Sequence, residues 1–117
     1  MEKNIKIVEG IWEDDPLLKD NFIRWEGGCN IFTLGGEEVR LDASAQYSVI
    51  LYSGKVIGIW QPEYNSAYII ANNKVISLHR RYANRSLPLK IWADKDQDRI
   101  WYHIDNRFGE TRYIKVK

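Results

Sequence analysis

Cysteine, proline and long apolar runs are scarce in this chain, and the scarcity excludes several classes of protein. Among 117 residues there are one cysteine and three prolines. A lone cysteine, Cys29, cannot form an intramolecular disulfide, so an oxidising compartment is not implied. No apolar run approaches the roughly 18 residues that span a bilayer, and the charged segment 1–6 lacks the apolar stretch of a signal peptide. We therefore expect a cytoplasmic protein that does not associate with membranes.

Catalytic and metal-binding signatures are also missing from the sequence. There is no glycine-rich phosphate loop, nucleophile elbow or cysteine and histidine metal spacing. The two histidines, His79 and His103, would serve as an acid and base pair only if the strands that carry them lie close together. We expect a non-catalytic protein that needs no cofactor or metal.

Aromatic residues, by contrast, are abundant, and tryptophan recurs in one context. Four of the five tryptophans directly follow an isoleucine, in the pairs Ile11–Trp12, Ile59–Trp60, Ile91–Trp92 and Ile100–Trp101. Because successive strand residues point to opposite faces of a sheet, each pair puts a large apolar group on both sides. Either another layer of the chain covers the second face, or that face binds a partner or ligand. We expect the tryptophan left outside to mark the functional face.

Turn signals recur at short, even intervals and divide the chain into segments of strand length. The pairs Gly27-Gly28, Gly35-Gly36, Ser53-Gly54 and Asn72-Asn73 separate runs rich in β-branched and aromatic residues. Glycine and asparagine tolerate the left-handed backbone of a two-residue hairpin. The pattern predicts a single all-β domain over residues 1–117, an antiparallel meander of about ten short strands in a small barrel or a two-layer sandwich. At most one short helix is expected, near residues 14–21.

Charge is unevenly distributed along the chain. Residues 1–63 carry 11 acidic and 6 basic side chains, whereas residues 64–117 carry 5 acidic and 11 basic ones. The two halves would pair with each other across the sheet, or the basic half would face an acidic partner. Within the basic half, the run from His79 to Arg85 combines arginine with tyrosine, which are residue types that dominate protein interfaces.

These features favour binding of another protein, as an inhibitor, immunity or adaptor protein. An acidic partner would suit the basic segment, and exposed strand edges make a homodimer an alternative. Single-stranded nucleic acid is a weaker alternative, because arginine and tyrosine can hold phosphates and bases but the net charge is only +1. The candidate binding residues are Trp60, Tyr64, Tyr68, His79, Arg80, Arg81, Tyr82, Arg85, Trp92, Trp101 and His103.

Two short elements at opposite ends of the chain offer a further interpretation. Gly10-Ile11-Trp12 near the start, together with Arg112 near the end, resembles the calycin group of lipocalins and fatty-acid-binding proteins. In that group a Gly-x-Trp on the first strand packs against a basic side chain from the last strand and closes one end of the barrel. The resemblance implies a β-barrel whose cavity holds one small apolar ligand. The alternative is a tryptophan that fills an ordinary β core.

Overall fold

Strands make up almost all of the regular structure in the part of the chain that can be described. The computed structural model describes residues 5–42, 46–61, 66–79, 90–94, 96, 98–103 and 111–116, with the backbone alone at residues 66 and 79. The strands of these ranges are β1 (Ile5–Ile11), β2 (Phe22–Glu26), β3 (Cys29–Leu34), β4 (Glu37–Asp42), β5 (Tyr47–Tyr52), β6 (Lys55–Trp60), β7 (Ser66–Ala71), β8 (Lys74–His79), β9 (Ile91–Asp94), β10 (Arg99–His103) and β11 (Thr111–Lys115).

Helical structure in these ranges is limited to one 3₁₀ turn, η1 (Lys19–Asn21). It follows a tight loop in which the Asp15 carboxylate accepts a hydrogen bond from the Leu17 amide at 2.9 Å. This agrees with the expectation of at most one short helix near residues 14–21. Among the described residues, no helix has the length and apolar character of a membrane span.

The four predicted two-residue turns are all present. Each joins two paired antiparallel strands, and both central residues of each turn have positive φ, for example +56° at Gly27 and +84° at Gly28. Positive φ at both positions is what a type I′ hairpin requires, and its twist matches that of the flanking strands. The sequence therefore predicts these hairpins by a physical rule about the backbone.

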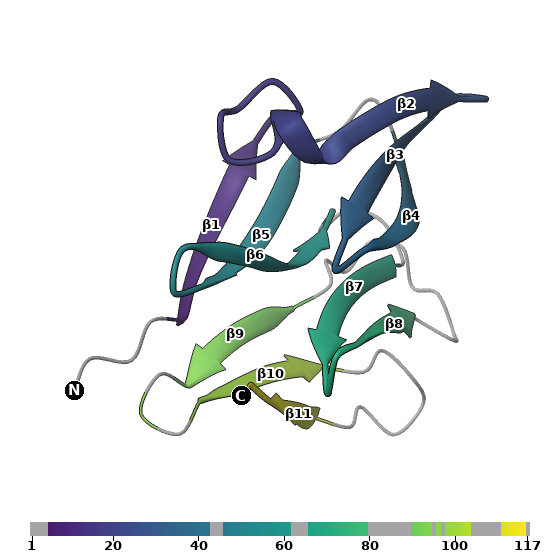
Figure 1. Cartoon of the computed structure of the whole chain (residues 1–117). Coiled ribbons are helices and arrows are strands. Elements are labelled where there is room, and N and C mark those ends of the chain that lie inside the picture. The colour runs from purple at the N-terminus through teal and green to yellow at the C-terminus, as the bar shows by residue number, and fades with distance from the viewer. Residues whose placement is uncertain are drawn as a thin grey trace.

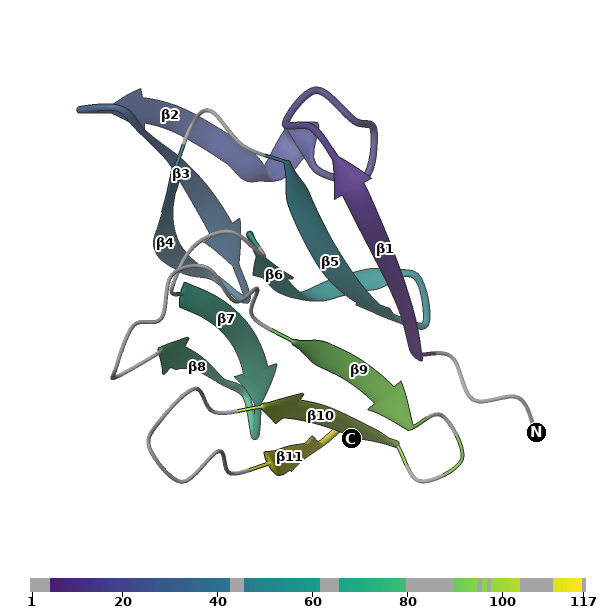
Figure 2. The ribbon, with the colours of Figure 1, turned by 180° about the vertical axis from the view of Figure 1, so that it is seen from behind.

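The strands form three antiparallel sheets. The central sheet has the order β1-β5-β6-β7-β8, and two three-stranded sheets have the orders β2-β3-β4 and β11-β10-β9. In Figures 1 and 2, β2 runs along the top of the molecule, β10 and β11 lie at the bottom, and the strands of the central sheet occupy the height between them. The all-β antiparallel prediction is confirmed. The described central sheet has β1 and β8 as its two edge strands, so closure into a barrel is not observed. Packing of one sheet on another is observed.

Two separate cores lie on opposite sides of the central sheet. The upper core lies toward β2–β4 and contains Leu18, Phe32, Leu34, Val39, Leu41, Tyr47, Val49, Leu51 and Ile59. The lower core lies toward β9–β11 and contains Ile5, Ile50, Ile57, Trp60, Ala67, Ile69, Leu78, Ile100 and Val116. Neighbouring residues of one strand enter different cores, as Val49 and Ile50 do on β5. The middle of the central sheet, at β5 and most of β6, is therefore buried on both faces.

The four Ile–Trp pairs can now be sorted by this arrangement. In every pair the isoleucine belongs to one of the two cores or packs against it. Trp60 alone among the four tryptophans is buried, because β6 lies inside the central sheet. The other three come from positions that no second layer of described residues covers fully: Trp12 and Trp92 are exposed and Trp101 is half-buried.

A buried polar cluster fixes the end of β4 against the central sheet. The Gln61 side chain is 2% exposed. Its oxygen accepts a hydrogen bond from the Asp42 amide at 3.1 Å, and its nitrogen donates to the Asp42 carbonyl at 2.8 Å. The Tyr47 hydroxyl donates to the same carbonyl at 2.7 Å and accepts from the Asn30 side chain at 3.1 Å. These bonds satisfy groups that would otherwise be costly to bury.

The burial of Tyr47 in this cluster should make the native state less stable at high pH. Burial raises the pKa of Tyr47 above its ordinary value of 10.0, and the hydrogen bond from Asn30 opposes the rise only in part. The unfolded chain loses the phenolic proton first, so the native state loses stability as the pH rises above about 10. Urea unfolding at a series of pH values should show this loss, and it should be smaller in Tyr47→Phe. An equal loss in the variant would contradict the assignment.

Candidate functional site

The sheet β9–β11 turns one face to the lower core and the other away from the molecule. Ile100 is fully buried and Ile91 on the neighbouring strand packs against the same core. Strand alternation then places the intervening residues on the outer face. There the register aligns Trp92 on β9 with Trp101 on β10, and Trp101 with Tyr113 on β11. We call Trp92, Trp101 and Tyr113 the aromatic row.

The rings of the aromatic row are accessible to different degrees, and two of them are in contact. Trp92 is 42% exposed and Tyr113 46% exposed, while Trp101 between them is half-buried. The ring centroids of Trp101 and Tyr113 are 4.8 Å apart with the planes inclined by 51°. The guanidinium carbon of Arg99 lies 4.4 Å from the Tyr113 centroid, a cation–π contact that holds the ring on one side.

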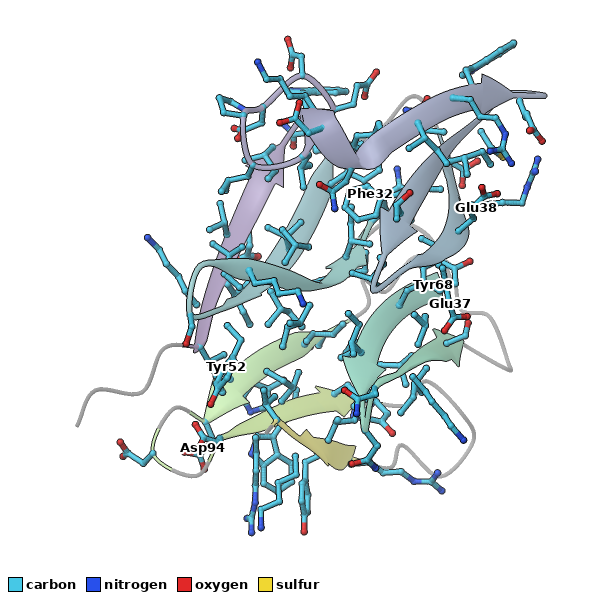
Figure 3. The ribbon with its side chains drawn as sticks, viewed as in Figure 1. Phe32, Glu37, Glu38, Tyr52, Tyr68 and Asp94 are labelled. Atoms are coloured by element: carbon cyan, nitrogen blue, oxygen red, sulfur yellow. The ribbon has the colours of Figure 1, made fainter. Side chains whose placement is uncertain are left out.

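Polar side chains line both sides of the aromatic row. On one side Arg99 is aligned with Asp94 on β9 and with Lys115 on β11, and Figure 3 labels Asp94 at the end of β9. On the other side His103 is aligned with Thr111, and the His103 Nδ1 lies 3.4 Å from the Thr111 hydroxyl. The outer face is therefore an aromatic stripe between polar margins, and the Arg99 margin has two cations and one acid.

Three of the predicted binding residues meet on this face. Trp92, Trp101 and His103 come together, because Trp101 and His103 are two residues apart on β10 and Trp92 on β9 is aligned with Trp101. Sequence reasoning missed Tyr113 and Arg99. The signal that would have found Tyr113 is the alternation in Thr111 to Lys115, but its alignment with Trp101 depends on a register that the sequence does not fix.

The remaining predicted residues are placed differently or fall outside the described ranges. Trp60 lies in the lower core and is 2% exposed, so it forms no part of a surface. Tyr68 is half-buried, and its hydroxyl donates a hydrogen bond to the Arg40 carbonyl at 3.3 Å, which joins β7 to β4. Figure 3 labels Tyr68 and Glu37 at this junction. The side chain of His79 and all of Tyr64, Arg80, Arg81, Tyr82 and Arg85 lie outside the described residues.

A second exposed apolar region follows β1 in the chain. Trp12, Leu17, Ile23 and Trp25 are all exposed, and Trp25 at 65% is the most exposed large hydrophobic side chain that the structure describes. Trp25 is the one tryptophan that does not follow an isoleucine, since Arg24 precedes it. The Ile–Trp pattern therefore does not include Trp25, although a basic residue before it and an acidic residue after it distinguish it in the sequence.

The packing implied by the calycin resemblance is absent. Trp12 follows the end of β1, whose hydrogen-bonded neighbour is β5, whereas Arg112 lies on β11 at the edge of another sheet. Figures 1 and 2 differ by a rotation about the vertical axis, and in both the end of β1 is near the top and β11 near the bottom. The two elements are thus at opposite ends of the molecule. Trp12, at 48% exposure, does not fill a core either.

Comparisons with known proteins add no family to this description. No protein-family model, curated protein or solved structure matches the chain. Among the described residues, no group of three histidine, cysteine, aspartate or glutamate side chains is placed to hold a metal ion.

Proposed function

We propose that the protein is a non-catalytic binding protein whose partner is another protein, in an inhibitor, immunity or adaptor role. The observation that supports this proposal is the aromatic row on the outer face of β9–β11. The inner face of this sheet already provides its share of the lower core, so the fold does not require three large rings outside. Tyrosine and tryptophan are enriched where proteins meet, because they bury much area with few rotatable bonds.

The charges beside the aromatic row indicate the chemistry of the partner. Arg99 and Lys115 lie on the same side of the row as Asp94. Lys90 is exposed just before β9, and its backbone carbonyl accepts a hydrogen bond from the His103 amide. Asp94 is the single acid among these positions. A partner segment with carboxylates beside apolar side chains would complement both features. An acidic partner is one of the two interpretations that the charge distribution of the sequence allows, the other being pairing between the two halves of the chain.

Ring geometry favours a protein partner over single-stranded nucleic acid. Bases stack in succession on aromatic side chains, which requires open ring faces. Here the Trp101 and Tyr113 planes are inclined by 51°, and Arg99 lies over the Tyr113 ring. Such rings suit side chains that insert between them better than a row of stacked bases. A small apolar ligand would need an enclosed cavity, and the described central sheet is open at both ends.

The double variant Trp92→Ala/Tyr113→Ala tests the proposed surface. Host lysate is passed over the immobilised wild-type chain, and the retained proteins are identified by mass spectrometry and purified for titration calorimetry. We expect the variant to bind the purified partner at least about tenfold more weakly, because exposed rings at an interface centre are typical hot spots. The matched control is Trp12→Ala, which removes a similarly exposed ring from another part of the molecule.

Two outcomes would overturn the proposal. One is equal affinity of the wild type and the double variant for the retained protein. The other is retention that disappears after nuclease treatment of the lysate, which would assign the face to nucleic acid.

Raising the salt concentration should weaken the wild-type complex, because the contacts of Lys90, Arg99 and Lys115 with carboxylates are screened.

A further inference from the structure

Strand β2 is a free edge among the strands that the structure describes. Its sheet has the order β2-β3-β4, so β2 has β3 on one side and no described strand on the other. In Figures 1 and 2 it runs along the top of the molecule. The outer edge of such a strand presents backbone amide and carbonyl groups that can pair with a strand from another chain. The position is independent of the surface proposed above, which lies on a different sheet.

The two faces of β2 differ sharply in character. Trp25 is aligned with Asn30 on β3, and Asn30 with Leu41 on β4, so Trp25 lies on the face that turns toward the upper core. At the edge strand no further described strand flanks it, and 65% of the residue remains exposed.

The opposite face carries Arg24 and Glu26. Arg24 is aligned with Ile31 on β3, and Ile31 with Arg40 on β4. Ile31, which lies between the two arginines in the register, is only 1% exposed.

An ordered ion-pair network holds these charges in place. Arg24 donates to both carboxylate oxygens of Glu38, at 2.6 and 3.1 Å, and also to Glu26. Glu26 in turn accepts from Arg40 at 3.3 Å. All four residues belong to the first half of the chain, so these ion pairs are not an instance of the pairing between halves that the charge distribution allows. Each such exposed pair contributes little to stability, but the network fixes which charge lies on each side of Trp25.

We propose that β2 pairs with β2 of a second copy of this chain, antiparallel and about a two-fold axis at Trp25. A cation lies one residue before Trp25 and an anion one residue after it, so the strand is complementary to itself when reversed. In this register Arg24 faces Glu26 of the partner subunit, Glu26 faces Arg24 of the partner subunit, and the two Trp25 side chains are direct cross-strand neighbours. The two three-stranded sheets become one six-stranded sheet in an isologous dimer.

Other registers are disfavoured by charge or by face. A shift that centres the axis on Arg24 or on Glu26 puts like charges opposite each other. A shift of one residue in the pairing would place the Trp25 side chain among the charges of the partner, because a one-residue slip exchanges the faces. The irregularity in the pairing of β2 with β3 falls between Phe22 and Arg24. Residues 24 to 26, which the register uses, lie beyond it and are regularly paired.

Charge reversal with mixing tests this register. The full chain, studied by sedimentation equilibrium, should self-associate with a dissociation constant below about 1 mM. Arg24→Glu makes both charged positions of β2 acidic, and Glu26→Arg makes both basic, so each variant alone should dimerise at least about tenfold more weakly. A 1:1 mixture of the two should form a heterodimer, because every charged position then faces its opposite. Trp25→Ala should also weaken the dimer, whereas Trp12→Ala should not.

Each possible result supports or overturns the proposal. A wild-type chain that stays monomeric at millimolar concentration overturns it, as do single variants that associate like wild type or a mixture that fails to associate. Far-UV circular dichroism confirms that each variant is folded. If a single variant fails to fold, the double variant Arg24→Glu/Glu26→Arg provides the answer: it restores opposite charges across the axis and must dimerise, since a monomeric, folded double variant would exclude the register.

Discussion

Replacing Trp60 by alanine should lower the free energy of unfolding by about 3–5 kcal/mol, a value typical of a large ring removed from a core. Trp60 is aligned with Ser48 on β5 and with Ala67 on β7, both buried. These small neighbours leave room for the indole in the middle of the lower core, and the alanine variant would leave a cavity there. Because domains of this size are stable by only about 5–15 kcal/mol, the loss would be a large part of the total.

Urea denaturation of Trp60→Ala and Trp92→Ala measures this contrast. Trp92→Ala should change the unfolding free energy by about 1 kcal/mol or less, since it loses mainly a cross-strand contact with Trp101. In the binding assay the order should be reversed. Among the molecules that remain folded, Trp92→Ala should weaken binding of the partner more than Trp60→Ala does. Equal destabilisation by the two substitutions would contradict the distinction between a core ring and a surface ring.

The all-β class of the fold can be predicted from local rules about turns and strands. The four two-residue turns depend on left-handed backbone at glycine, asparagine and serine, and strand lengths follow from the spacing between turns. The alternation of side chains along a strand predicts that the two residues of each Ile–Trp pair lie on opposite faces of the sheet. It does not say which strands gain a second layer, because that depends on how sheets pack over one another.

Only part of the candidate site could be predicted from the sequence, because the site too depends on how distant strands pair and pack. Trp92, Trp101 and His103 were identified as large or titratable side chains in strands, but Tyr113 joins them only through the β10–β11 register. Trp60 has the same sequence context as Trp92, yet Ser48 and Ala67 become its neighbours through pairings between segments that the local sequence does not link. Local patterns indicate what a residue is suited to, while its place inside or outside depends on long-range pairing.

Gly35→Ala, in the turn between β3 and β4, should lower the unfolding free energy by about 2–4 kcal/mol. Part of this loss comes from the backbone conformation of the turn, and part from its packing against a strand that is distant in the sequence. Gly35 has a φ of +58°, and an added Cβ would lie 2.7 Å from Cδ1 and 3.2 Å from Cγ1 of Ile70 on β7. The neighbouring Gly36 has a φ of +82°, but its added Cβ meets nothing within 4 Å.

Gly36→Ala is therefore the matched control, because it incurs the backbone strain without the clash and should cost about 1–2 kcal/mol. Ile70→Val removes the nearest atom, so the double variant Gly35→Ala/Ile70→Val should be more stable than the sum of the single effects predicts, by about 0.5 kcal/mol or more. Urea denaturation of the four proteins completes the cycle. Additive effects, or equal losses for Gly35→Ala and Gly36→Ala, would show that the turn does not pack against β7 and that backbone strain alone determines the glycine requirement.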